Sequence, residues 1–406
     1  MSGASLLSTL RFRDFRNLWL GSFASYAGQW IQQATIAWLA YDMTGSSSLL
    51  GAIMGMRAIP MFLCAPIAGV AADRYDRRSL LLLSQLISAT TALVFGIVLA
   101  TGNAQVWHLF LFVVVSGVGA VMDRPVRLTL IFDLVPRETV MQAVALNMLA
   151  FSITRVGGPA VAGFLIGWVG AAGNFFLQSA AYAIAMATAL LITFPAIAPR
   201  ERRASAYSEL VAGLKYAWAD RKARVLLGIG VLPFIFLVPI FSGLLPVYAK
   251  DIYHAGPEVL GLLLTSVGVG GVAGGWLAAR CMRFPRQGLV QAYAVFAMCA
   301  AFVVLAVAPG VALACAALAA AGMGEMVHFT SSQATLQMSV PEAMRGRMAS
   351  LQQLCPGFIS IGVLIAGVLT DFMGVQLLTG LVAAVTAVLT ALLLTPRGGL
   401  NAVRVS

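Results

Sequence analysis

The sequence predicts an all-α membrane protein with twelve transmembrane helices in two pseudo-symmetric six-helix bundles. Of its 406 residues, 60% are hydrophobic and only 10% are charged, a composition outside the range of soluble globular domains. The apolar runs reach about 20 residues or more, the length that a helix needs to cross a bilayer. Uninterrupted runs of this length favour helices over the alternating strands of a membrane barrel.

The predicted spans follow one another along the whole chain. They cover residues 17–41, 48–72, 79–101, 106–127, 141–168, 173–195, 223–249, 257–280, 287–308, 310–333, 346–370 and 373–395. We expect the first span to be retained, because it is too long for the apolar region of a signal peptide. The longest polar stretch, 196–222, is a predicted cytoplasmic linker between an N-terminal bundle, 1–195, and a C-terminal bundle, 223–406. Its amphipathic segment, 207–218, is expected to lie on the membrane surface.

The basic residues predict the orientation of the chain. The formal net charge is +11, which by itself is compatible with nucleic-acid binding. If both termini are cytoplasmic, however, 23 of the 26 Lys and Arg residues fall in cytoplasmic segments, as the positive-inside rule requires. Topology therefore explains the excess of positive charge, and we expect no nucleic-acid partner.

The two halves repeat each other at an offset of about 205 residues. Leu134-Val-Pro136-Arg-Glu138 after the fourth span matches Met338-Ser-Val-Pro341-Glu342 after the tenth. The same offset relates Gly69 to Gly274, Gly117 to Gly322 and Gly119 to Gly324. Duplicated six-helix units are the architecture of many secondary transporters, whose substrate site lies near mid-membrane between the repeats.

A dense group of charges lies between the second and third spans. In Gly69-Val-Ala-Ala-Asp73-Arg74-Tyr-Asp76-Arg77-Arg78, Asp73 is expected to end one helix and the arginines to open the next. Asp123-Arg124, expected at the end of the fourth span, is a candidate partner for this hinge. The hinge is either a positive-inside anchor or a latch that breaks and re-forms during transport; its paired acids and close glycine favour the latch.

The fifth span contains a proline among small residues. Proline removes a helical hydrogen bond, and small neighbours let another helix approach closely, so the segment is either a tight packing site or a moving part. The hinge, its candidate partner and this segment together supply the predicted gating residues. They are Gly69, Asp73, Arg74, Arg77, Arg78, Asp123, Arg124, Gly158, Pro159 and Gly163.

Three ionisable residues lie well inside predicted spans, away from the span ends, and are candidates for proton coupling: Glu325, Arg155 and Arg57. Charges inside a membrane are costly and mark a transport pathway or an ion pair. Glu325 is the preferred proton carrier, because a carboxylate removed from water exchanges a proton more readily. A static ion pair with Arg155 or Arg57 is the alternative. His328 is expected near the membrane surface.

Polar amides and aromatic residues in the spans predict a substrate cavity. The candidate substrate-binding residues are Gln29, Trp30, Gln32, Gln33, Phe236 and Gln352. Amides at mid-span avoid lipid, so they either line a water-filled cavity or join helices by hydrogen bonds. A large, mostly apolar cavity with a few amides suits an amphiphilic organic molecule.

The cysteines and histidines predict no cofactor, metal site or catalytic centre. The five cysteines have no paired spacing and the three histidines are scattered, so we expect neither a metal cluster nor a membrane-embedded enzyme.

Several of these motifs resemble the major facilitator superfamily. Gly69-x-x-x-Asp73-Arg74-x-x-Arg77-Arg78 is similar to its loop motif, and Gly158-Pro159-x-x-Ala162-Gly163 to the fifth-helix motif of proton-coupled exporters. Val340-Pro341-Glu342-x-x-Arg345-Gly-Arg347 and Phe12-Arg-Asp14-Phe-Arg16 resemble the bacterial branch that contains enterobactin exporters and multidrug efflux proteins.

The resemblance implies proton-driven export of a small molecule across the bacterial inner membrane, with Asp73, Arg74 and Arg77 as gating residues. The fourth-helix arginine motif of many drug antiporters has no clear counterpart, which puts more weight on Glu325. We expect a monomer whose partners are its substrate, protons and membrane lipids. Uptake, lysolipid flipping by the same fold and a non-transporting sensor are the alternatives.

Overall fold

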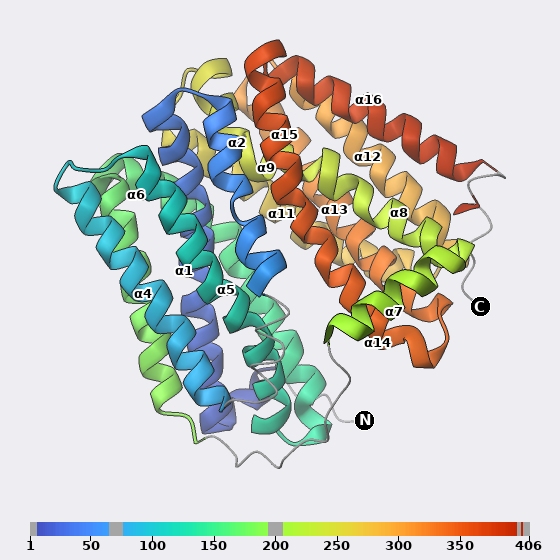
Figure 1. Cartoon of the computed structure of the whole chain (residues 1–406), viewed down its shortest axis with the longest axis horizontal. Helices are drawn as coiled ribbons and strands as arrows, with labels where there is room; N and C mark the ends of the chain where they lie inside the picture. Colours follow the sequence, from blue (N-terminus) through green and yellow to red (C-terminus); the bar gives the residue numbers. More distant parts are fainter. Residues whose placement is uncertain (1–5, 65–75, 194–205, 396–398, 401–406) are drawn as a thin grey trace. The chain divides into compact units, whose positions relative to one another are not determined.

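The computed structural model describes residues 6–64, 76–193, 206–395 and 399–400 (Figure 1). Throughout these residues the regular secondary structure is helical, which confirms the predicted fold class. The chain divides into two compact units. The first comprises Met1–Leu39 and Ile59–Arg203, and the second comprises Ala40–Ala58 and Ala204–Ser406.

The first unit is formed by helices. They are η1 (Leu6–Arg11), most of α1 (Arg13–Thr44), η2 (Pro60–Cys64), α4 (Arg77–Ala100), α5 (Val106–Leu134), η3 (Arg137–Thr139) and α6 (Val140–Leu190). Buried apolar side chains from four of these helices form its core, among them Phe15, Leu81, Leu130 and Leu146.

The second unit contains the end of α1 and the remaining helices. They are α2 (Ser47–Gly55), α7 (Ala206–Ala219), α8 (Arg221–Phe236), α9 (Val238–Gly243), α10 (Leu245–Val247), η4 (Tyr248–Ile252), α11 (Pro257–Cys281), α12 (Gln287–Val307), α13 (Val311–Ser339), α14 (Glu342–Leu354), η5 (Cys355–Gly357), α15 (Phe358–Met373) and α16 (Val375–Leu394). The amphipathic segment expected in the linker is helical, as α7.

Twelve membrane spans fit the structure. Ten helical segments of the described chain are long and apolar enough to cross a membrane. One of them, Arg137–Leu190, has 54 residues and bends at Gly170, whose φ of 72° is in the left-handed region that favours glycine. This bend separates the predicted fifth and sixth spans. The more polar α1 is also long enough, with 32 residues.

The predicted seventh span is interrupted twice. The sequence predicts a bendable helix there, because proline interrupts helical hydrogen bonding and the span contains Pro233, Pro239 and Pro246. The structure instead divides it into α8, α9, α10 and η4, with breaks at Leu237 and Leu244. Pro239 and Pro246 lie in the first turn of α9 and of α10, where the missing N–H of proline costs no hydrogen bond.

Helices α11 and α12 of the second unit both pack against α13. A Cβ atom at Gly270 of α11 would overlap the carbonyl of Ala319 in α13, and one at Gly322 of α13 would overlap the carbonyl of Val267. On the side of α12, a Cβ at Gly324 would lie 2.6 Å from Met298 Cγ. Glycine therefore lets both helices approach the backbone of α13 closely.

Candidate functional site

The described part of the hinge forms a polar cluster at the start of α4. Gly69, Asp73 and Arg74 lie outside the described residues. The carboxylate of Asp76 caps α4 by accepting from the backbone N–H of Ser79 at 3.1 Å. Arg77 forms an ion pair with Asp133 of α5, and Arg78 donates to the Leu190 carbonyl at 3.4 Å. The arginines of the hinge thus bind α5 and the end of α6.

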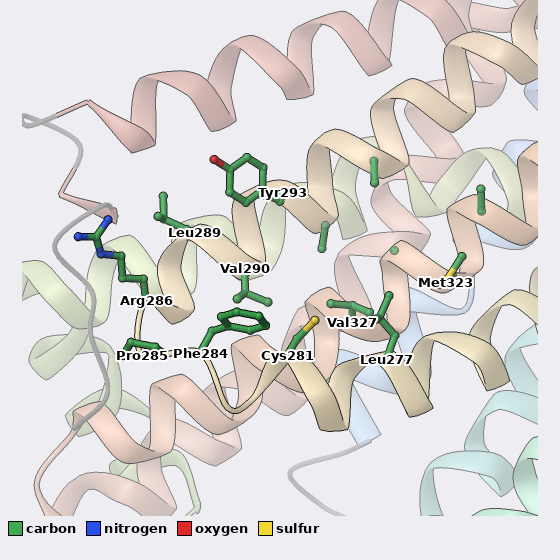
Figure 2. A pocket seen from close by; sticks show the side chains of 14 residues that line it. Leu277, Cys281, Phe284, Pro285, Arg286, Leu289, Val290, Tyr293, Met323 and Val327 are labelled. Carbon is green, nitrogen blue, oxygen red and sulfur yellow. The ribbon is translucent and has the colours of Figure 1, made fainter.

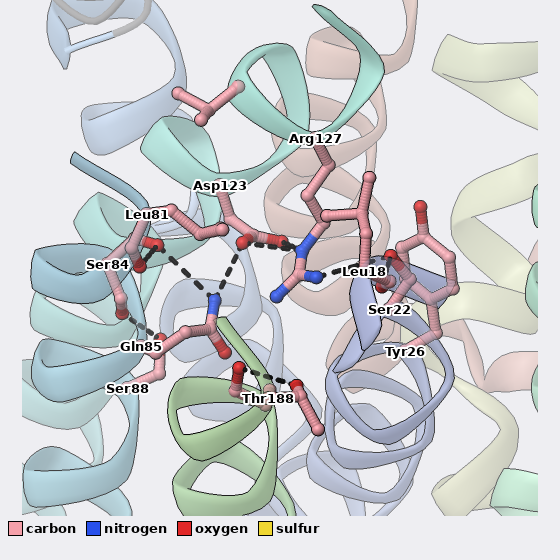
Figure 3. A network of polar contacts seen from close by, with 12 residues as sticks. Leu18, Ser22, Tyr26, Leu81, Ser84, Gln85, Ser88, Asp123, Arg127 and Thr188 are labelled. Atoms are coloured by element: carbon pink, nitrogen blue, oxygen red, sulfur yellow. Dashed lines mark hydrogen bonds and ion pairs between the residues drawn. The ribbon is translucent and has the colours of Figure 1, made fainter. Parts of the chain in front are cut away.

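A buried ion pair lies deeper in the first unit (Figure 3). Arg127 Nε donates to both oxygens of Asp123, at 2.7 and 2.8 Å, and Gln85 Nε2 donates to Asp123 Oδ1 at 2.6 Å. Arg127 Nη1 reaches Ser22 Oγ of α1 at 3.2 Å. Asp123 is 3% exposed and Arg127 is 2% exposed. The pair therefore joins α1, α4 and α5 away from water.

Local sequence explains how this network forms. Asp123 and Arg127 are four residues apart, so both lie on one face of α5. A Cβ atom at Gly119 would lie only 2.7 Å from Ser88 Oγ, so α4 and α5 approach closely beside the pair. This approach brings Gln85 within hydrogen-bonding distance of the carboxylate. Among the described residues, Arg127 Nη2 and Gln85 Oε1 have no hydrogen-bond partner.

The expected position of Asp123 at the end of the fourth span is wrong. Helix α5 continues to Leu134, which leaves Asp123 within the helix. Its partner is Arg127, while the hinge residue Arg77 binds Asp133 instead. Arg124 also lies within α5. In the sequence, the charged residues Arg127 and Asp133 suggest that the span ends before them. A helix can nevertheless continue through charged residues when each of them is paired.

The fifth-helix motif packs α6 against α1. Gly158 and Pro159 are buried in α6, and Gly163 is buried one turn later. A Cβ atom at Gly158 would lie 2.5 Å from Trp30 Cβ, whereas one at Gly157 would meet open space. The small residues therefore provide the close approach that the sequence predicts. Whether the segment also moves stays a prediction.

The glutamines of α1 divide into two kinds. Gln32 is buried, donates to Ser116 Oγ of α5 at 2.9 Å and accepts from the Tyr182 hydroxyl of α6 at 3.2 Å. Gln32 thus joins helices, which is the alternative that the sequence left open. Gln29 and Gln33 are half-buried and belong to the remaining candidates for substrate contact.

The other candidate substrate residues lie in different surroundings. Gln352 of α14 is buried and donates to Ser332 Oγ of α13 at 3.3 Å, so it also joins helices. Phe236, the last residue of α8, is half-buried. Trp30 is half-buried beside Arg155, whose guanidinium carbon lies 5.8 Å from the ring centroid. This distance suits a cation–π contact.

The candidates for proton coupling are distributed over both units. Arg155 belongs to the first unit, and Glu325 and Arg57 belong to the second. Glu325 is half-buried in α13, and Arg57 is half-buried in the turn that follows α2. His328 is buried, with 1% of its surface exposed, so an exposed surface role does not fit, while its depth in the membrane stays a prediction.

Sequence reasoning also missed an acidic cap in the second unit. Asp371, near the end of α15, accepts from the backbone N–H groups of Ser47 and Ser48 at 3.0 and 2.9 Å and from the hydroxyl of Ser46 at 3.1 Å. A carboxylate at the N-terminus of α2 satisfies free N–H groups and interacts favourably with the helix dipole. No local pattern reveals this contact, since Ser47 and Asp371 are 324 residues apart.

Two further polar contacts join the end of α1, which precedes α2 in the chain, to η4. Lys250, the one basic residue in the segments expected outside, pairs with Asp42 at 2.6 Å. Tyr41 donates a short hydrogen bond to Asp251. The end of α1 is therefore bound to η4 by one ion pair and one hydrogen bond.

Ten helical segments of the described chain that are long and apolar enough to cross a membrane define a polytopic membrane protein. Residues 4–404 match the family described as transmembrane secretion effector. The chain belongs to this family, a branch of the major facilitator superfamily, and it is an efflux transporter.

The curated relatives are exporters and transporters that match over most of their length. The staphyloferrin A transporter of Staphylococcus aureus is 23% identical, over 87% of this chain and 89% of its own. The multidrug efflux pump Tap of Mycolicibacterium fortuitum is 22% identical, over 86% and 87%. The enterobactin exporter EntS of Shigella boydii is 26% identical, over 93% and 87%.

Solved structures share the fold at low sequence identity. The nucleoside transporter NupG superposes with a TM-score of 0.74 at 14% identity, covering 93% of this chain and 97% of its own. A POT family transporter in complex with a thioalcohol-conjugated peptide superposes with a TM-score of 0.75 at 11% identity, covering 98% and 100%. These likenesses support the fold alone.

Proposed function

We propose that this protein exports a small amphiphilic organic molecule across the bacterial inner membrane by alternating access, driven by proton antiport. The proposal rests mainly on sequence similarity to exporters of siderophores and drugs, which extends along nearly the whole chain. Both termini are cytoplasmic in this proposal, and the protein acts as a monomer.

Proton coupling needs a carboxylate within the membrane that changes its partners during the cycle. Two carboxylates are suitable. Glu325 lies half-buried in α13, and Asp123 is held by Arg127 and Gln85. A carboxylate in an ion pair favours its charged form, and it accepts a proton more readily when the cation withdraws. We assign the carrier role to Glu325 and the role of a charge relay to Asp123.

Gating follows from the hinge and the fifth-helix motif. The ion pair between Arg77 and Asp133 and the cap by Asp76 hold the start of α4. In the proposed cycle Arg77 and Asp76 hold the start of α4, and the gating contacts that break and re-form as the halves rock are made by Gly69, Asp73 and Arg74. Gln29, Trp30, Gln33 and Phe236 contact the substrate, while Gln32 and Gln352 shape its surroundings.

The test is transport in inside-out membrane vesicles with an imposed pH gradient. A screen of siderophores and lipophilic drugs against a deletion strain first supplies a transported compound. Glu325→Gln is then expected to abolish its proton-dependent accumulation, whereas Glu342→Gln, an exposed acid of α14, is expected to leave it unchanged. Protein levels and gel-filtration profiles monitor folding.

Three outcomes would contradict the proposal. Normal accumulation with Glu325→Gln removes Glu325 as the carrier, and the same measurement with Asp123→Asn then tests the second carboxylate. Accumulation that ignores the pH gradient removes proton coupling altogether. Unchanged substrate levels in cells that lack the protein indicate a sensor.

A further inference from the structure

An apolar cavity opens between α11, α12 and α13 of the second unit (Figure 2). Its volume is about 600 Å³, which is within the range of small-molecule sites. The lining is almost entirely apolar and includes Leu277, Phe284, Val290, Tyr293 and Met323. Arg286 is the one charged residue in the lining.

The cavity arises from small residues on the facing helices α12 and α13. Ala320 and Gly324 of α13 and Ala294 and Ala297 of α12 are among the residues that line it. Because these side chains are short, α11 and α12 pack on α13 without filling the space between them. Figure 2 shows the larger Phe284 at the turn between α11 and α12.

Arg286 of the lining lies in a turn that is rich in arginine. Arg283 and Arg286 are exposed in the turn between α11 and α12, and within the described residues neither guanidinium has a hydrogen-bonding or ionic partner. Arg280 lies over the ring of Trp276, with its guanidinium carbon 3.4 Å from the centroid. Trp276 is 61% exposed. Exposed tryptophan beside arginine is typical of the membrane–water interface.

We propose that this cavity binds one acyl chain of an anionic phospholipid whose phosphate contacts Arg286. The cavity lies in a membrane-spanning helix group, so lipid is the solvent of its apolar walls. The arginines at its end attract a negative headgroup. The positive-inside rule locates this end at the cytoplasmic leaflet. A free inorganic anion fits the arginines but leaves the apolar walls uncovered.

The test measures phospholipid retention by the purified full-length protein with native mass spectrometry. The protein is exchanged into detergent with phosphatidylglycerol or with phosphatidylcholine of the same chains. Arg286→Gln removes the cation, and Ala297→Phe fills the cavity from an exposed position on α12. Arg137→Gln is the control, because it removes an exposed arginine of the first unit that lies far from the cavity in sequence.

We expect the wild type to retain phosphatidylglycerol in preference to phosphatidylcholine. Arg286→Gln should weaken retention of phosphatidylglycerol about fivefold, the effect of one cation near a lipid surface. Ala297→Phe should reduce retention of both lipids, and Arg137→Gln should reduce neither. Gel filtration confirms that each variant is folded.

Three results would overturn the assignment. They are equal retention of the two lipids by the wild type, equal weakening by Arg137→Gln and Arg286→Gln, and undiminished retention with Ala297→Phe. Competition by inorganic phosphate that removes all bound lipid would also count against an acyl chain in the cavity. None of these results bears on export, which the vesicle assay measures separately.

Discussion

The buried ion pair of Asp123 and Arg127 should contribute strongly to the free energy of unfolding, and the effect of removing one side chain should depend on whether the other is present. Both side chains are almost completely buried, at 4% and 2% exposure, so neither charge is solvated when its partner is removed. Breaking a buried pair by removing one partner typically costs about 3–5 kcal/mol. Asp123→Asn and Arg127→Met should therefore each lower the free energy of unfolding by about that amount.

The double variant provides the decisive comparison. With Asp123→Asn and Arg127→Met together, no uncompensated charge remains, so the loss should be similar to that of one single variant. The interaction energy in this double-mutant cycle should then equal one single loss in magnitude, about 3–5 kcal/mol. Gln85 and Ser22 keep part of the network through their own hydrogen bonds to Ser84 and to the Leu18 carbonyl.

Unfolding of the purified protein in mixed micelles measures these differences. The exposed pair of Arg345 and Glu342 is the matched control, since its side chains are 48% and 88% exposed. Its cycle should give less than about 1 kcal/mol. If the two single losses at Asp123 and Arg127 simply add in the double variant, the argument from burial is refuted.

Two other substitutions test helix contacts. Asp371→Ala should lower the unfolding free energy by about 1 kcal/mol, because the backbone N–H groups of Ser47 and Ser48 lose their acceptor; an unchanged value in the same unfolding assay would contradict this role of the carboxylate. Gly158→Val should cost about 1–3 kcal/mol, because its side chain would collide with Trp30. Gly157→Ala, where a Cβ meets open space, is the control, and an equal loss there would argue against the collision.

The helices were predictable because apolar runs of bilayer length leave few alternatives. The division at Gly170 also falls between two predicted spans, since glycine tolerates the left-handed conformation that such a bend requires. The fourth span was predicted too short. Arg127 and Asp133 follow a long apolar run, and charges there usually indicate the membrane surface.

The polar site was harder to predict because its partners are distant in sequence. The spacing of Asp123 and Arg127 is a local signal for an ion pair on a helix, but Gln85 and Ser22 come from other helices. Gln32 was recognised as polar at mid-span, yet its partners Ser116 and Tyr182 decide its role. Composition locates polar residues in a membrane, whereas tertiary contacts determine what they do.

The contact between α2 and α15 has a consequence for biosynthesis. A Cβ at Gly51 would lie 3.0 Å from Gly367 Cα, so the two backbones nearly touch. Ser47 and Asp371 are separated by 324 residues. At about 5–20 residues per second, α2 therefore emerges from the ribosome roughly 15–65 seconds before its partner. During that interval the glycine face of α2 needs a temporary cover from lipid, the insertion machinery or another helix.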